Sequence, residues 1–462
     1  MSAPFWTIAE ASAALQKREA SPVDLVEACL TRIEAIDGKL HSYLLVLADE
    51  SRKAAKTAET AILRGERKGP LHGIPIALKD IYETAGIRTT GHSRIKLDHV
   101  PRRDATVTQK LAEAGTILLG KLATHEFAMG GPSFDLPFPP ARNPWNLANF
   151  TGGSSSGSGA AVAAGLALGA MGSDTGGSIR LPASHCGIAG IKPSYGRVSR
   201  AGIFPLSFAL DHAGPMAWTA RDCALLLQAI AGPDPRDPTA AELPVPDYAA
   251  ALGGDLRGMS VGVPRNLFAA DPALDPEMRS AVEAAIAELG RLGARVEEVS
   301  LSPLDDYHAA CVLILLSEAY AVHEATLKAR WRDYGAIFRH RLMTGATISA
   351  ADYVQATRLR RKLALELDDA LARHTVLAFP SVFAPAGPIE SVPGLAFLEK
   401  AALTTPANVS GHPAMSVCCG FSKSGMPLGL QLVGRRFDEA TLLKVGDAYE
   451  RATPWRARRP AL

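Results

Sequence analysis

The spacing of hydrophobic and polar positions predicts helices over the first sixty residues. Ser21-Pro22 is a typical N-cap and first helical position, and we expect the helix that begins there to end near Ile36. A third helix is expected at about 48–63. The segment GIPIALKDIY, residues 73–82, has the first strand-like apolar run, and Lys79 interrupts it.

Helix-like and strand-like segments alternate through the rest of the chain. Residues 103–129 are expected to form a helix, a short strand and another helix, whereas 130–153, rich in Pro, Asn and Gly, predicts a long irregular loop. Further helices are predicted near 220–231, 276–292, 308–330, 350–373 and 438–451, and buried strands at VLAFPS, PAMSVCCGF and PLGLQLVG. Such alternation predicts an α/β protein with a sheet covered by helices.

The Gly/Ser-rich segment GGSSSGSG, residues 152–159, has two interpretations. By composition it resembles a flexible linker between domains. It lies, however, between apolar elements, and AAVAAGLALGAMG follows it directly as a predicted small-residue helix. We therefore favour a buried functional loop.

Composition narrows the classes of function. The 462 residues are 47% hydrophobic and carry a formal net charge of +2, which indicates neither a nucleic-acid nor a membrane surface. No signal peptide or membrane-spanning stretch is expected. The six cysteines are scattered, which favours reduced, buried thiols in a cytoplasmic protein. No HExxH, clustered His/Cys set or GKS/T phosphate loop occurs, so we expect no metal and no cofactor.

The candidate chemistry lies in two Gly/Ser-rich segments, TGGSSSGSG at 151–159 and GSDTGGSIRLP at 172–182. The backbone N–H groups of Thr175, Gly176, Gly177 and Ser178 could form an oxyanion hole beside a nucleophilic Ser178. A serine nucleophile needs a base, and Lys79 is a candidate because burial in an apolar strand would favour its neutral amine.

The sequence resembles the amidase signature family of hydrolases from about residue 7 to the C-terminus. The densest similarity covers residues 152–200, and it extends to GIPIALKD around Lys79, GKLATHEFAMG at 120–130 and SGHPAMSVCCGFSKSGMPLGLQLVG. The resemblance implies a catalytic triad of Lys79, Ser154 after a cis peptide bond, and the nucleophile Ser178. It also implies one domain, 1–462, built on a large mixed β-sheet with helices on both faces. Its parts would be N-terminal helices (1–65), a signature core (66–240), a variable substrate-pocket region (241–400) and C-terminal strands with a helix (401–462).

Other roles follow from the same resemblance. We expect Gly153 and Ser155 to support the relay, Asp174 to brace the nucleophile loop, and Arg180 to bind either a substrate carboxylate or a structural partner. The substrate pocket is expected to include Phe127, Met129 and Gly130. His125 and His185 are expected to be packed histidines rather than acid–base groups.

The expected reaction is hydrolysis of a small-molecule amide, on an apolar aryl or alkyl substrate, with carbamates (urethanes) and esters as further candidates. The expected oligomeric state is a monomer or homodimer.

Two competing interpretations remain open at the level of sequence. In the first, Gly153 to Gly157 is the GxSxG elbow of an α/β-hydrolase, with Ser155 as nucleophile. In the second, the chain is the amidase-type component of a tRNA-dependent amidotransferase. Those chains carry Gln after Ser-Ile-Arg and Asp before Glu-Phe, whereas this chain has Leu181 and His125. These departures favour a free-standing amidase.

Overall fold

The computed structural model describes residues 5–462, and its centre is one 11-stranded mixed sheet. The strand order is β1-β3-β2-β6-β8-β7-β12-β13-β11-β9-β10, with parallel pairing of β2 with β3 and β6 and of β9 with β10 and β11. The strands are β1 Tyr43–Val46, β2 Pro75–Lys79, β3 Ile117–Leu122, β6 Gly169–Asp174, β7 Ala189–Lys192, β8 His212–Ala217, β9 Ser260–Val263, β10 Arg295–Glu298, β11 Val376–Pro380, β12 Ala414–Phe421 and β13 Pro427–Gly434. Strands β4 Arg142–Asn143 and β5 Asn146–Phe150 form a separate hairpin.

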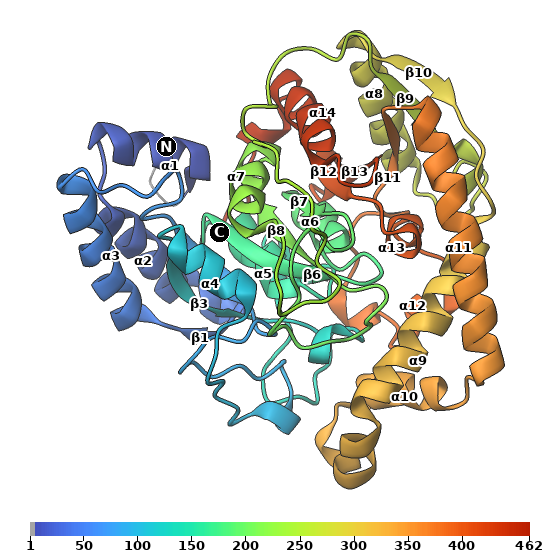
Figure 1. Cartoon of the computed structure of the whole chain (residues 1–462), viewed down its shortest axis with the longest axis horizontal. Helices are drawn as coiled ribbons and strands as arrows, with labels where there is room; N and C mark the ends of the chain where they lie inside the picture. Colours follow the sequence, from blue (N-terminus) through green and yellow to red (C-terminus); the bar gives the residue numbers. More distant parts are fainter. Residues whose placement is uncertain (1–4) are drawn as a thin grey trace.

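Helices cover both faces of the sheet and form an outer group beyond it (Figure 1). They are α1 Ile8–Lys17, α2 Pro22–Leu40, α3 Ala48–Leu63, α4 Thr106–Glu113, α5 Ser156–Ala163, α6 Arg180–Cys186, α7 Ala220–Ile230, α8 Pro276–Arg291, α9 Leu304–Arg330, α10 Ala336–Ala346, α11 Ala350–Arg373, α12 Ala396–Glu399, α13 Thr405–Ser410 and α14 Glu439–Ala452. The fold is the predicted α/β arrangement.

Strand β6 shows how the two faces differ. A side chain added at Gly169 would point to Leu226 of α7 and Ile8 of α1, whereas one added at Gly172 would meet Ser155 and Ile179. Positions three apart on a strand point to opposite faces. Helices α1 and α7 therefore cover one face of β6, and the segments around α5 and α6 cover the other.

Sequence patterns located most elements within a few residues, with informative exceptions. The second helix does not stop near Ile36 but continues through Gly38 to Leu40, because an exposed glycine weakens a helix without ending it. The predicted helix AAVAAGLALGAMG is instead the end of α5 followed by strand β6. The helix predicted after β3 is a single 3₁₀ turn, Glu126–Ala128.

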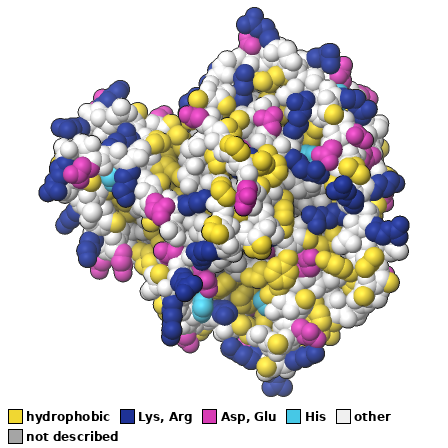
Figure 2. Space-filling model, in the orientation of Figure 1, with side chains coloured by type: hydrophobic (Ala, Val, Ile, Leu, Met, Phe, Trp, Pro, Cys, Tyr) yellow, Lys and Arg dark blue, Asp and Glu magenta, His cyan; other side chains and the backbone are white. Residues whose placement is uncertain are grey.

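The GGSSSGSG segment is buried throughout, so the linker interpretation is wrong. The six cysteines are buried free thiols, as the composition predicts. Helix α9 with the turn that follows it is long and apolar enough to span a membrane by length and composition alone, but half of its most apolar window is buried inside the protein. Figure 2 shows charges of both signs around the rim of one face and hydrophobic side chains near its centre.

Close packing of α5 against the chain around it makes Gly157 a sensitive position. A Cβ there would lie 2.4 Å from the Ser42 carbonyl oxygen and 2.5 Å from the Ala123 nitrogen, both backbone atoms. We predict that Gly157→Ala lowers the free energy of unfolding by about 1–3 kcal/mol, measured by thermal or denaturant unfolding. Gly38 is the control: it lies in α2 with no atom within 4 Å of an added Cβ, so Gly38→Ala should leave stability unchanged or raise it. If Gly157→Ala and Gly38→Ala lowered the free energy of unfolding equally, this explanation from packing would be contradicted.

Candidate active site

The central feature of the site is the buried amine of Lys79, the last residue of β2. Its Nζ donates to three hydroxyls: Ser154 Oγ at 2.7 Å, Ser173 Oγ at 2.8 Å and Ser155 Oγ at 3.1 Å. Because β2 and β6 are parallel neighbours, Lys79 and Ser173 lie near the same edge of the sheet. The amine itself is thus fully buried and surrounded by hydroxyls.

Burial lowers the pKa of Lys79 to about 7, although the more distant carboxylates of Asp174 and Asp211 oppose the shift. No carboxylate within the described part of the chain forms an ion pair with Lys79. Removal from water disfavours the ammonium form, and hydroxyls stabilise it less than an anion would. A large fraction of Lys79 is therefore a neutral amine near neutral pH, as a general base requires.

Ser154 follows a cis Gly153–Ser154 peptide bond and lines the same pocket as Ser178. A Cβ on Gly153 would lie 2.2 Å from Nε2 of His125, so only glycine fits against that ring. The His125 backbone N–H also donates to the Ser154 carbonyl at 3.0 Å. These contacts fix the position of Ser154 between Lys79 and the pocket.

Ser155 contacts the base but does not line the pocket. Its hydroxyl is fully buried, donates to the Ser173 carbonyl and accepts from the Ser173 N–H, both at 3.2 Å. It is not among the residues that line the pocket around Ser178. The α/β-hydrolase interpretation, which needs an accessible Ser155, does not fit this geometry.

Asp174 holds the loop that carries Ser178. Its carboxylate accepts from the Gly177 N–H at 2.8 Å and from the Ile179 N–H at 3.1 Å. Gly177 has φ of +130°, and a Cβ there would clash with Thr404 at 2.3–3.0 Å, so this position requires glycine. The loop is therefore fixed from within.

The contact between Asp174 and Gly177 removes one of the four predicted oxyanion-hole donors. The Gly177 N–H points to Asp174 and is not free for a substrate oxygen, in contrast to the sequence-based prediction. Among residues 5–462 the structure gives no acceptor to the N–H groups of Thr175, Gly176 and Ser178, and all three residues line the pocket. These three remain the candidate donors.

Arg180 is a structural residue rather than a substrate ligand. It is fully buried, and its guanidinium donates to Asp174, Gln431, Asn408 and the Thr404 carbonyl at 2.6–3.0 Å. Burial opposes ionisation of the Asp174 carboxyl, but Arg180 outweighs it and holds the pKa of that carboxyl well below its ordinary value. With this complete set of partners, the guanidinium has no donor left for a substrate.

A cavity of about 270 Å³ opens onto Ser178, which is only half-buried. Met129 and Gly130 line it as predicted, but Phe127 does not. Phe127 is instead packed in an aromatic cluster with His323 and Phe338, at ring-centroid distances of 4.8 and 5.7 Å. Its backbone lies in the left-handed region, with φ of 42°.

The two histidines near the site are packed groups. His125 stacks on Phe150 at 5.9 Å, and burial lowers its pKa to about 3. His185 meets the edge of the same Phe150 ring, and burial lowers its pKa to about 4. Both rings are neutral at physiological pH.

Two functional candidates have no counterpart in the sequence-based prediction. Ser173 was missed because its contact with Lys79 depends on the pairing of β2 with β6, although it lies inside the GSDTGGS segment. Arg341 was missed because helix α10 itself was not predicted, and this arginine lines the pocket from that helix.

The chain belongs to the amidase family, whose model, described as Amidase, matches residues 24–443. Among curated relatives, the A-type chain of the Glutamyl-tRNA(Gln) amidotransferase from Moorella thermoacetica is 42% identical over 483 residues, covering 99% of each chain.

Solved structures agree with this assignment. The corresponding amidotransferase chain from Thermotoga maritima has a TM-score of 0.82 at 34% identity, covering 98% of this chain and 96% of that chain. The native peptide amidase from Stenotrophomonas maltophilia has a TM-score of 0.85 at 33% identity, covering 98% of both.

These relatives correct the sequence-based preference for a free-standing amidase. Curated chains with 40–42% identity over nearly the full length carry the name of that amidotransferase component. The departures at Leu181 and His125 therefore do not separate this chain from those relatives. Both positions lie beside the triad, where Leu181 adds to the pocket wall and His125 packs on Gly153.

The low pKa of Lys79 predicts a specific pH dependence. Since the neutral amine accepts the proton, log kcat/KM on one amide should rise with pH through about 7 and level off above it. Lys79→Arg should lose nearly all activity at every pH, because a guanidinium stays charged. Near wild-type activity with an unchanged profile in Lys79→Arg would make Lys79 a structural cation.

The partners of Arg180 predict a loss of stability. Arg180→Gln would leave the buried Asp174 carboxylate without its cation, and we expect a loss of about 3–5 kcal/mol in the free energy of unfolding. Arg103→Gln, at an exposed position, is the control and should unfold like the wild type. If Arg180→Gln kept the wild-type stability and changed only KM, by raising it, Arg180 would be a substrate-binding residue instead.

Proposed function

We propose that the chain hydrolyses the carboxamide of a small substrate through an acyl-enzyme on Ser178. The observation that carries this proposal is the hydrogen bond from the buried Lys79 amine to Ser154, which lines the same pocket as Ser178. Ser178 Oγ attacks the carbonyl carbon while its proton passes through Ser154 to Lys79. The same proton then returns to the leaving nitrogen as the C–N bond breaks.

The second half of the reaction repeats these steps with water. Water attacks the acyl carbon, its proton passes to the lysine, and Ser178 leaves with that proton as the acid is released. The free N–H groups of Thr175, Gly176 and Ser178 are suited to stabilise the oxyanion in both halves. Every proton taken up by Lys79 is given back within the cycle.

The charges in the pocket favour an amide that carries a carboxylate. Arg341 is almost fully buried, and its Nε and Nη2 share one acceptor, the Gly394 carbonyl, at 2.9 and 2.7 Å. Lys400 lines the same pocket, and no Asp or Glu is part of the lining formed by the described residues. A buried guanidinium without a carboxylate partner is costly, and a substrate carboxylate would provide one.

Glutamine is an amide whose carboxylate could pair with Arg341, and it agrees with the names of the full-length relatives; the described lining gives its α-ammonium no carboxylate partner. We therefore propose a glutaminase-type amidotransferase component that works with partner chains in the cytoplasm. Apolar walls from Met129, Phe150, Leu316 and Phe397 favour a second candidate class, neutral apolar amides such as those expected from the sequence.

The test compares glutamine with a neutral amide of similar size, butyramide, by ammonia release. Ser178→Ala should abolish turnover of both by several orders of magnitude with the fold intact. Arg341→Gln should raise KM for glutamine at least about tenfold and leave butyramide unchanged. Faster hydrolysis of butyramide and nitroanilides than of glutamine, with no effect of Arg341→Gln on glutamine, would favour the neutral-amide class.

A further inference from the structure

A second cavity, of about 590 Å³, lies beside the active site, and the proposed reaction does not use it. Loops between β7 and β8 and after α7 form most of its wall, and α9 and α11 contribute Glu318 and Arg360. It shares only Ala128 and Leu206 with the cavity at Ser178. It is more than twice the volume of that cavity, so it can hold an independent small molecule.

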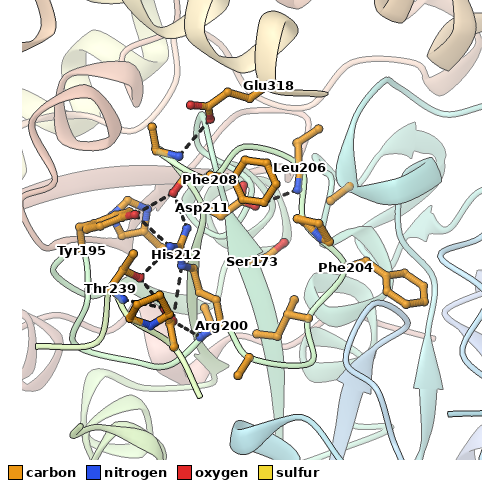
Figure 3. A pocket seen from close by; sticks show the side chains of 18 of the residues that line it. Ser173, Tyr195, Arg200, Phe204, Leu206, Phe208, Asp211, His212, Thr239 and Glu318 are labelled. Atoms are coloured by element: carbon orange, nitrogen blue, oxygen red, sulfur yellow. Dashed lines mark hydrogen bonds and ion pairs between the residues drawn. The ribbon is translucent and has the colours of Figure 1, made fainter. Parts of the chain in front are cut away.

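The body of the cavity is apolar and partly aromatic. Its wall includes Ile203, Phe204, Leu206, Phe208, Ala209 and Ala213. Figure 3 shows Phe204, Phe208 and Ser173 among the side chains that line this cavity. Phe208 is 56% exposed, an unusual exposure for a phenylalanine, which places it at the mouth. Such a wall suits a flat apolar or aryl group.

The carboxylates of the wall are already occupied. Asp211 accepts from the Thr175 hydroxyl at 2.7 Å and from two backbone N–H groups at 2.8 and 3.0 Å. Asp237 accepts from the Thr239 hydroxyl at 2.6 Å and from a backbone N–H at 2.7 Å. Glu318 accepts from the Tyr353 hydroxyl at 2.7 Å and the Ala209 N–H at 2.9 Å. These acids fix the loops and are not arranged to bind a cation.

The cations of the wall differ in what they bind. Arg200 is held by the wall: its terminal nitrogens donate to the Phe208 carbonyl, the Tyr195 hydroxyl and the Thr239 hydroxyl at 2.7–2.9 Å, and its Nε lies 3.7 Å from Asp237. Arg236, a third cation of the wall, is exposed and donates from Nη2 to the Asp104 carbonyl at 3.1 Å. Arg360 uses only Nε, which donates to the Val409 carbonyl at 3.0 Å. Among residues 5–462, no acceptor and no ion pair is found for the two terminal nitrogens of Arg360, although its side chain is half-buried.

Burial lowers the pKa of Arg360, although nearby groups that include Tyr195 and Glu318 oppose the shift. Two free, coplanar N–H groups of a guanidinium match the two oxygens of a carboxylate. The terminal N–H groups of Arg360 therefore suit a carboxylate, and the apolar wall suits a flat aryl ring.

We propose that this cavity is a second ligand site, separate from the substrate pocket, for a small organic carboxylate with an aryl or similarly flat apolar body. The carboxylate binds the terminal nitrogens of Arg360, and the ring lies against Phe204 and Phe208. None of Lys79, Ser154 and Ser178 lines this cavity, and its one link to the base is Ser173, whose hydroxyl accepts from Lys79 and which is part of the wall.

The test measures binding of 4-(trifluoromethyl)benzoate to the full chain by ¹⁹F NMR titration. Arg360→Gln should weaken binding at least about tenfold, since the glutamine keeps polar character but not the charged bidentate contact. Arg361→Gln is the matched control, an exposed arginine one residue further along α11 that is not part of this cavity, and it should bind like the wild type. The neutral 4-(trifluoromethyl)benzamide should bind at least about tenfold more weakly than the acid.

A further variant separates this site from the substrate pocket. Arg341→Gln should leave benzoate binding at the second site intact, whereas a loss of all binding in that variant would place the probe at Ser178 and overturn the proposal. Equal binding by Arg360→Gln and the wild type would overturn it as well. Should Arg360→Gln fold poorly, Ala209→Trp, which fills the cavity from its wall, must abolish the same binding, and binding retained in a folded Ala209→Trp protein contradicts the site.

Discussion

The structure of the active site depends on one interaction, the set of hydroxyl contacts to the buried amine of Lys79. An ammonium group has three N–H donors, and the hydroxyls of Ser154, Ser155 and Ser173 provide three acceptors. The site can therefore hold the proton during the reaction without a carboxylate that would keep it there permanently. A carboxylate in contact with the amine would raise the pKa of the lysine and remove the base.

One buried ion pair keeps this arrangement in place. Asp174 and Arg180 form a fully buried ion pair whose other donors reach Gln431 on β13 and Asn408 on α13. Strand β6, the nucleophile loop and the C-terminal part of the chain are thus joined at one point. Because the same carboxylate also binds the Gly177 and Ile179 N–H groups, the ion pair sets the direction of the oxyanion donors.

Much of this could be predicted from the sequence because the signals are local. The apolar run around Lys79 and the glycines before Ser178 identify a strand and a turn within a few residues. What could not be predicted depends on contacts between distant segments. The Ser173 contact requires the pairing of β2 with β6, and the loss of Gly177 as an oxyanion donor requires the side-chain direction of Asp174. No local pattern indicated the left-handed backbone at Phe127.

The central claim is that Lys79 is a neutral amine near pH 7, and direct titration of that amine tests it. NMR of the Ser178→Ala protein with ¹³C-labelled lysine can follow the Cε resonance of Lys79, assigned by its absence in a Lys79→Arg variant. The account predicts a transition with a midpoint at about pH 7, set by burial. A Cε resonance that stays at the ammonium position up to about pH 10, near the ordinary lysine pKa, would contradict the account and leave the site without its base.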